Sequence, residues 1–118
     1  DYYYLFVNWD VCCSGISSTY NIRIGRSLSP TGPFLDKEGN DMRLGGGTLF
    51  MDAQGMIVGD SRFIGPGHSG IYTQENGKDY FSHHFYDGAN NGMPSLAIWP
   101  LEWVNGWPEI DVFGTIDF

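Results

Sequence analysis

Short segments of alternating apolar and polar residues recur along this chain, with Gly- and Pro-containing turns between them. Aromatic residues crowd positions 2–9 and again positions 80–86. The chain has 17 Gly and 6 Pro, so few stretches that lack both are long enough for a helix. Those stretches are rich in Tyr, Phe, Ile, Val and Trp, which favour strands. The pattern therefore predicts an all-β chain.

The two aromatic segments begin an internal repeat. Residues 1–10 and 79–87 share one pattern, an acid, an aromatic strand and a second acid, at an offset of 78 residues. A polar loop follows each copy, and then a second alternating strand around positions 22–24 and 96–98. Repeats of this size that are built of short strands are typical of β-propellers, in which each blade is a four-stranded sheet.

The repeat divides the chain into about two four-stranded antiparallel blades. We expect residues 1–44 to form a first blade that lacks its inner strand, and residues 45–64 to form a hairpin between the blades, with arms at 48–51 and 56–58. The second blade is expected over residues 65–110. Its four strands are predicted at 69–73, 79–86, 95–99 and near 107–110.

The C-terminal segment 111–118 also alternates apolar and polar residues at several positions, which predicts a strand. We predict that residues 112–118 supply the missing inner strand of the first blade, either in their own chain or in a neighbouring one. The propeller would then be completed by a homo-oligomeric ring, by a complementary N-terminal propeller fragment or by upstream sequence. The alternative is a frayed tail.

Charge and composition narrow the choice of partners. The 118 residues suffice for one modest domain, and 14 acidic residues against 6 Lys and Arg give a net charge of −8. This balance argues against binding to nucleic acid or to an anionic membrane surface. No apolar run is long enough to span a membrane, and no signal-like segment precedes the first strand. The two cysteines, Cys12 and Cys13, are adjacent, so we expect two free thiols, and they do not reveal the compartment.

Several motifs follow one another in a fixed order. They are DYYYLFVNWDVCCSG at 1–15, STYNIRIGRS at 18–27, TGPF at 31–34, GGGT at 45–48, GPGHSG at 65–70, DYFSHHFYD at 79–87, and PLEW with GWP at 100–108. In this order they resemble the last third of a glycoside hydrolase family 43 catalytic domain of the endo-α-1,5-L-arabinanase type, that is, the C-terminal blades of a five-bladed propeller.

The resemblance implies an enzyme that hydrolyses α-1,5-L-arabinofuranosidic bonds with inversion and that is secreted or periplasmic. Its catalytic residues, two Asp and one Glu, would all fall upstream of Asp1. We therefore expect no catalytic residue in this chain and no activity from this stretch alone. Three classes stay open: a piece of an enzyme, a sugar-binding module that lost the acids, and a structural propeller module that self-assembles.

His68 is the candidate metal ligand. It follows Gly-Pro-Gly, which allows close backbone approach, and the resemblance implies that it points into the central channel and holds calcium or a similar ion among waters. Calcium prefers oxygen ligands, so the alternative is a histidine that forms hydrogen bonds within a tight turn.

Three further residues are weak candidates for substrate binding. The resemblance places the loop with Cys12 and Cys13 beside the substrate cleft, and His84 at the position of a family histidine. His83 and His84 are neighbours on one strand and should point to opposite faces. A packed role is the alternative for all four residues.

The remaining polar and aromatic residues have structural interpretations. Asp10 and Asp87 end equivalent strands, which indicates loop caps rather than catalysts. The other acids are predicted to be solvated, and the tryptophans to fill the space between blades, with sugar stacking as the alternative. These residues are Asp36, Glu38, Asp41, Asp52 and Asp60, and Trp9, Trp99, Trp103 and Trp107.

Overall fold

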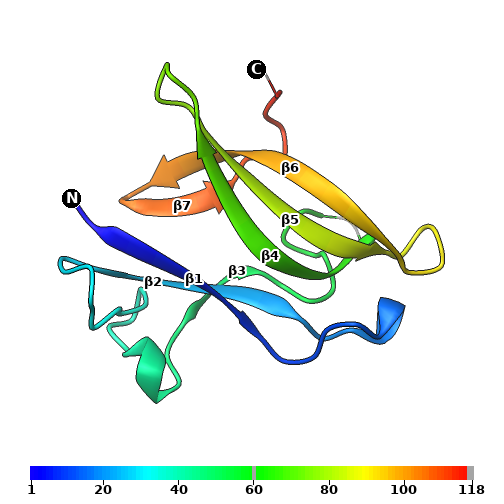
Figure 1. The fold of residues 1–118 in the computed structure, drawn as a ribbon, viewed down its shortest axis with the longest axis horizontal. Helices are drawn as coiled ribbons and strands as arrows, with labels where there is room; N and C mark the ends of the chain where they lie inside the picture. The colour runs from blue at the N-terminus through cyan, green and yellow to red at the C-terminus, as the bar shows by residue number, and fades with distance from the viewer. Residues whose placement is uncertain (60, 117–118) are drawn as a thin grey trace.

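The computed structural model describes residues 1–59 and 61–116, which form two antiparallel β-sheets that face each other (Figure 1). The first sheet has the order β1-β2-β3 and the second the order β4-β5-β6-β7. The all-β prediction is confirmed. The strands are β1 (Tyr3–Trp9), β2 (Asn21–Ser27), β3 (Thr48–Met51), β4 (Phe63–Thr73), β5 (Asp79–Asp87), β6 (Met93–Val104) and β7 (Trp107–Ile110), with short 3-10 turns at Gly15–Ser17 and Met42–Leu44.

The hydrophobic core lies between the two sheets. The ring of Phe81 on β5 is fully buried and packs 4.9 Å from the ring of Phe50 on β3 and 5.6 Å from that of Phe6 on β1. Ile22 and Ile24, the alternating residues of β2, lie in the same cluster. Because the core draws on both sheets, neither sheet buries its apolar face alone.

Two of the four tryptophans pack between the sheets, where the pattern predicted all four. Trp103 and Trp107 of the second sheet pack against Tyr4 of the first, with ring centroids 4.9 and 6.2 Å apart. Trp99 packs on Phe63 within the second sheet. The four tryptophans thus include two that join the sheets directly.

The predicted hairpin at 45–64 is wrong in its second arm. Thr48–Met51 is a strand, but it pairs with β2 and closes the first sheet, whereas residues 56–58 form turns. The carboxylate of Asp52 accepts hydrogen bonds from the backbone N–H groups of Met56 and Ile57. This side chain holds the segment as a loop, because it satisfies N–H groups that a strand would need for pairing. Asp60 lies outside the described residues.

The first strand of the second sheet begins earlier than predicted. It starts at Phe63 rather than at residue 69, and it includes the Gly-Pro-Gly segment. Its pairing with β5 shifts register twice, between Ile64 and Gly67 and between Gly67 and Gly70. These irregularities explain why the alternating pattern breaks there although the strand continues.

The described part of the C-terminal segment, residues 111–116, does not complete the first sheet within its own chain. Residues 111–116 form a turn and irregular structure, and Asp111 N–H donates to the carbonyl of Pro100 in β6. The ammonium of Lys78 donates to the carbonyl of Thr115 at 3.2 Å. The described part of the tail therefore lies against the second sheet. Residues 117 and 118 lie outside the described residues, and donation to a neighbouring chain stays a prediction.

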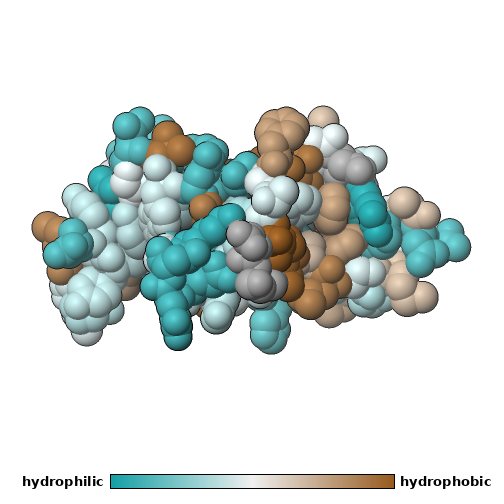
Figure 2. All heavy atoms as spheres, turned by 90° about the horizontal axis from the view of Figure 1, so that it is seen from above, coloured by the Kyte–Doolittle hydropathy of each residue, from teal (hydrophilic) through white to brown (hydrophobic). Residues whose placement is uncertain are grey.

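Apolar side chains are exposed on part of the surface, including positions in β4 and β6. Figure 2 shows apolar residues gathered on one half of the face that it views. A groove of about 520 Å³ runs over β4, β5 and β6, lined mainly by apolar residues that include Ile71, Tyr72 and Ile98. No helix in the described part of the chain could cross a lipid bilayer.

Asp36 is not solvated, contrary to the sequence prediction. It is only 8% exposed, and its carboxylate accepts hydrogen bonds from the backbone N–H groups of Glu38, Asn40 and Gly47. These bonds, led by that from Gly47, lower the pKa of Asp36. The acidic loop is therefore a closed structure built around one carboxylate. Asp41 pairs with Arg43 at 3.0 Å.

His83 is fully buried in the second sheet. Its Nε2 accepts a hydrogen bond of 2.9 Å from the indole N–H of Trp99, which leaves Nδ1 protonated to donate to the carbonyl of His84 at 3.0 Å. Burial lowers the pKa of His83 to about 4. The residue is thus a neutral core histidine.

His83 should make stability depend on pH. The unfolded chain binds a proton at this position as the pH falls through about 6.5, whereas the folded protein resists protonation until about pH 4. Between these two pH values the unfolded state binds more protons than the folded state. The free energy of unfolding therefore decreases as the pH is lowered from about 6.5 to about 4, and His83 accounts for about 3 kcal/mol of this decrease.

A His83→Gln variant isolates this effect, because the amide keeps a donor and an acceptor but does not titrate. Urea unfolding followed by tryptophan fluorescence should show the stability advantage of the wild type over the variant shrinking by about 3 kcal/mol from pH 7 to pH 4. An advantage that is independent of pH would contradict this account.

Candidate functional site

The candidate residues gather where the loop after β1 meets the second sheet. This loop, residues 10–20, contacts the start of β4 and the end of β5. We call the cluster the junction site. It consists of Asn8, Cys12, Cys13, Tyr20, His68, His84 and Tyr86.

Asn8 joins the two sheets and holds the backbone of His68. Its side-chain amide donates hydrogen bonds of 3.0 Å to the carbonyls of Asn21 and Pro66, and its amide oxygen accepts one from the N–H of His68 at 3.3 Å. His68 has a φ of 55°, a conformation that is uncommon for residues other than glycine. Its side chain is exposed, so the imidazole is accessible at the junction.

The glycines before His68 let the loop pack on β4. A Cβ atom at Gly67 would lie 2.5 Å from the ring of Tyr20, and one at Gly65 would lie 2.8 Å from the Cβ of Ser18. No side chain fits at either position without moving the loop. The Gly-Pro-Gly motif is therefore required by the close approach of residues 18–20.

His84 lies on the opposite side of β5 from His83, as the alternation predicted, and faces the loop. Its ring stacks on that of Tyr20 with centroids 6.2 Å apart and an interplanar angle of 15°. Burial lowers the pKa of His84, and the nearby charge of His68 lowers it further. His84 is thus a neutral imidazole at neutral pH, able to donate one hydrogen bond and accept another.

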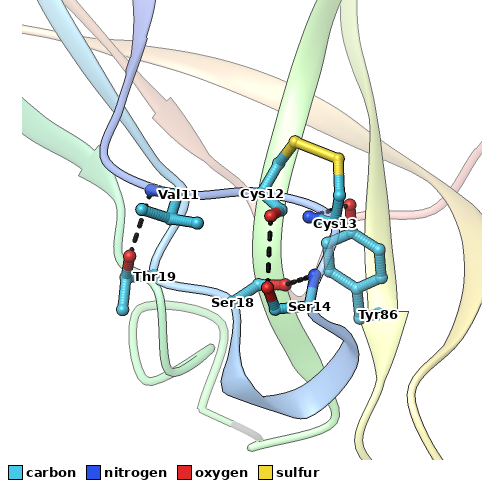
Figure 3. The surroundings of a disulfide bond; sticks show 7 residues. All are labelled: Val11, Cys12, Cys13, Ser14, Ser18, Thr19 and Tyr86. Carbon is cyan, nitrogen blue, oxygen red and sulfur yellow. Dashed lines mark hydrogen bonds between the residues drawn. A yellow bond between two sulfur atoms is a disulfide. The ribbon is translucent and has the colours of Figure 1, made fainter.

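Cys12 and Cys13 form a disulfide, so the expectation of two free thiols is wrong (Figure 3). Cys13 adopts a φ of 69°, and its N–H donates to the hydroxyl of Tyr86 on β5 at 2.9 Å. Ser14 N–H donates to the hydroxyl of Ser18 at 3.0 Å. These bonds hold the loop in a shape that brings adjacent sulfurs together. In the disulfide neither sulfur is a thiolate, so neither is a nucleophile.

The residues at the junction do not fit a calcium site held by this chain alone. Calcium takes six to eight oxygen ligands, whereas His68 offers one nitrogen. Within residues 1–59 and 61–116, no three His, Cys, Asp or Glu side chains gather around a point that could hold a metal ion. The ion in the channel stays a prediction.

The carboxylates beside the junction have structural partners. Asp87 is buried, pairs with Arg62 at 3.1 Å and accepts a hydrogen bond from the N–H of Ala89. Asp10 accepts one from the amide of Asn21. The interpretation of Asp10 and Asp87 as loop caps agrees with these bonds.

The chain matches the family model of glycosyl hydrolases family 43 over residues 1–108. It belongs to this family. The predicted resemblance is thereby confirmed across nearly the whole chain, and the matched region includes every residue of the junction site.

Curated relatives and solved structures define the similarity further. An extracellular exo-α-(1→5)-L-arabinofuranosidase of Cellvibrio japonicus is 46% identical over 112 residues, 94% of this chain and 30% of that protein. An extracellular endo-α-(1→5)-L-arabinanase of Bacillus subtilis is 47% identical over 107 residues, 91% of this chain and 30% of that protein. The structure of Cellvibrio cellulosa α-L-arabinanase complexed with arabinohexaose matches with a TM-score of 0.83 and 46% identity, covering 94% of this chain and 33% of that one.

These matches confirm the predicted fold class, blades of a family 43 propeller. They also show that the chain spans about a third of the length of the relatives that it matches.

Sequence reasoning missed three residues of the junction site: Asn8, Tyr20 and Tyr86. Asn8 had a visible signal, because it is the one amide in an otherwise aromatic and aliphatic strand. Tyr20 and Tyr86 had none, because their roles depend on which loop packs on which strand.

Replacing Asn8 by Ala should destabilise the chain and release His68. The change leaves two carbonyls and one N–H at the junction without their partner, so we expect a loss of about 2 kcal/mol in the free energy of unfolding and faster hydrogen exchange at His68 N–H. Urea unfolding and amide exchange measure the two effects. Asn90→Ala, in an exposed turn, is the matched control and should change stability by less than about 0.5 kcal/mol. Equal effects of the two variants would contradict the role of Asn8.

Reducing the disulfide should loosen the loop but leave the fold. Adjacent cysteines close no long chain segment, so the cross-link hardly restricts the unfolded state. We expect the melting temperature of a Cys12→Ser/Cys13→Ser variant to stay within about 3 °C of the wild type, while exchange at residue 13 N–H increases. Tyr86→Phe removes the acceptor of that N–H and should accelerate the same amide. Global unfolding of the double variant would show that the disulfide has a larger role than this.

Proposed function

We propose that this chain is the part of an arabinan-degrading family 43 hydrolase that forms one side of the sugar-binding surface. Cleavage of α-1,5-L-arabinofuranosidic bonds would depend on carboxylates outside the chain. The observation that carries the proposal is the match of nearly the whole chain to an arabinanase structure that contains arabinohexaose. The extracellular relatives support secretion as its location.

The chemistry of the junction site suits a neutral sugar chain. Sugar sites combine apolar surfaces with a few fixed hydrogen-bonding groups. The disulfide and the ring of Tyr20 supply apolar surface, and the neutral imidazole of His84 supplies a donor and an acceptor. Arabinan carries no charge, so the net charge of −8 does not oppose its binding.

The carboxylates of this chain suit structural roles better than catalysis. Inversion needs a general acid and a general base about 6.5–9.5 Å apart, and the acid normally has a raised pKa. Hydrogen bonds lower the pKa of both Asp36 and Asp41. Asp87 is paired with Arg62. These features support an acid and a base located elsewhere in the enzyme.

A second candidate is a sugar-binding module that assembles into a ring of identical chains. The open apolar groove over β4, β5 and β6 favours it, because a neighbouring sheet would cover that surface. Light scattering separates the candidates: the ring requires a mass several times 13.2 kDa, whereas the single chain has a mass of 13.2 kDa.

The test combines binding with hydrolysis. Titrated with arabinohexaose, the chain should show amide shift changes at Cys13, Tyr20 and His84, and with linear arabinan it should release no reducing ends at an enzymatic rate, typically about 10 s⁻¹. Tyr20→Ala should weaken binding about tenfold, which corresponds to the loss of one ring contact. Tyr3→Ala, on an exposed ring at the far end of β1, is the matched control and should leave binding unchanged.

Two results would contradict the proposal. Hydrolysis of arabinan at enzymatic rates by the pure chain would place the acid and base within it. Equal shift changes with maltohexaose, a glucose hexamer of the same length, would show that the junction site does not select arabinan.

A further inference from the structure

A second pocket lies at the other end of β2, about 20 Å of extended strand away from Tyr20. There the guanidinium carbon of Arg26 lies 3.9 Å from the centroid of the Tyr2 ring and 4.4 Å from that of Trp107. The ammonium of Lys37 lies 5.8 Å from the same Trp107 ring. We call this the Arg26 pocket. It has a volume of about 250 Å³ and is lined by Tyr2, Arg26, Leu35, Asp36, Lys37, Gly39 and Trp107.

The guanidinium of Arg26 is fixed in place. One of its terminal nitrogens, Nη1, donates a hydrogen bond of 3.0 Å to the carbonyl of Gly106, which also accepts one from the hydroxyl of Tyr4. Gly106 has a φ of 81°, and a Cβ atom there would lie 2.7 Å from Nη1 of Arg26. The turn between β6 and β7 therefore provides both the anchor and the room for this side chain.

The two cations of the pocket lack a carboxylate partner. Arg43 and Arg62 each pair with an aspartate, but no carboxylate of residues 1–59 and 61–116 lies within ion-pair distance of Arg26 or Lys37. Asp36 lines the pocket, but its two oxygens accept three backbone hydrogen bonds from its own loop. Arg23 and Lys78 also form no ion pair with the described residues, so the distinguishing feature of the Arg26 pocket is that its two cations lie near the same Trp107 ring in one pocket.

We propose that the Arg26 pocket binds the carboxylate of an acidic sugar. Only Nη1 of the guanidinium donates a hydrogen bond to the protein. Nε and Nη2 have no acceptor among the described residues. Nε and Nη2 of an arginine can donate two parallel hydrogen bonds to the two oxygens of one carboxylate. Lys37 adds a second positive charge, and Tyr2 and Leu35 offer apolar surface to a sugar ring. The volume lies below the about 300–1,000 Å³ of sites for larger ligands, so it suits a single sugar unit.

This site is independent of the junction site. Arabinan is neutral and has no carboxylate that could pair with Arg26 and Lys37. The Arg26 pocket would therefore hold an acidic unit of a mixed polysaccharide rather than the arabinan chain.

Galacturonate is the probe, and galactose, which carries a hydroxymethyl group in place of the carboxylate, is the matched control ligand. Titrated into the ¹⁵N-labelled chain, galacturonate should shift the amide of Gly106, the side-chain Nε–H of Arg26 and the indole N–H of Trp107. Galactose should give at least tenfold weaker binding, and acetate, which lacks the ring, at least fivefold weaker binding.

Two variants test the residues. Arg26→Gln should weaken galacturonate binding at least tenfold, and Lys37→Gln about threefold. Lys37 is exposed, so its variant keeps the test decisive if Arg26→Gln does not fold. Arg43→Gln, which removes a cation that already has a partner, is the control and should have no effect. Arabinohexaose shifts at Cys13 and Tyr20 should persist in every variant, which separates this site from the proposed function.

The proposal is overturned if galactose or acetate binds as well as galacturonate, or if either Lys37→Gln or a folded Arg26→Gln binds it like the wild type. Galacturonate shifts at the junction site, with none at Gly106, would also overturn it.

Discussion

The packing of Phe81 against Phe6 and Phe50 is the interaction on which the rest of this structure depends. A sheet with one apolar face must bury that face against another layer, and each of these two sheets is the layer on which the other packs. The three rings come from β1, β3 and β5, with centroids 4.9 to 5.6 Å apart. Their contact fixes the position of one sheet relative to the other, and every feature that involves both sheets follows from it.

Both candidate sites are such features. At one end of the interface, Asn8 of the first sheet holds the backbone that carries His68 in the second. At the other end, Arg26 of the first sheet is anchored by Gly106, in the turn directly before Trp107 of the second. Polar groups line the two ends of the interface, where they reach water, and aromatic rings fill the middle. This distribution is the one expected if burial drives the packing and the exposed ends are left for binding.

The sequence pattern predicted the strands where apolar residues alternate, and it failed where a single side chain decides the backbone. The strand predicted at 79–86 is β5, and the predicted arm at 48–51 is β3, although it completes the first sheet rather than a separate hairpin. The predicted arm at 56–58 is a loop because Asp52 captures its N–H groups. The prediction that Asp36 is solvated was wrong because the N–H of Gly47 reaches its carboxylate only when the loop is closed, and the sequence pattern does not show that closure.

The same reasoning applies to the site residues. His68 and His84 were identified because their motifs occur in a known order, and both lie at the junction. The disulfide was missed because a bond between adjacent cysteines is rare, and no local residue pattern signals the positive φ of Cys13 that accompanies it here. The contacts of Asn8, Tyr20 and Tyr86 reach across 13 to 73 residues of sequence, so periodicity carried no information about them.

Native-state hydrogen exchange tests the central claim most directly, which is that the two sheets form one cooperative unit through their shared aromatic core. The account predicts that the amides of Ile24 in β2 and Phe81 in β5 exchange with the same free energy of opening, equal to that of global unfolding. It also predicts that Phe81→Ala lowers both by the same amount, about 3–5 kcal/mol. Exchange of Ile24 at a much lower free energy than Phe81, with only Phe81 affected by the substitution, would contradict the claim.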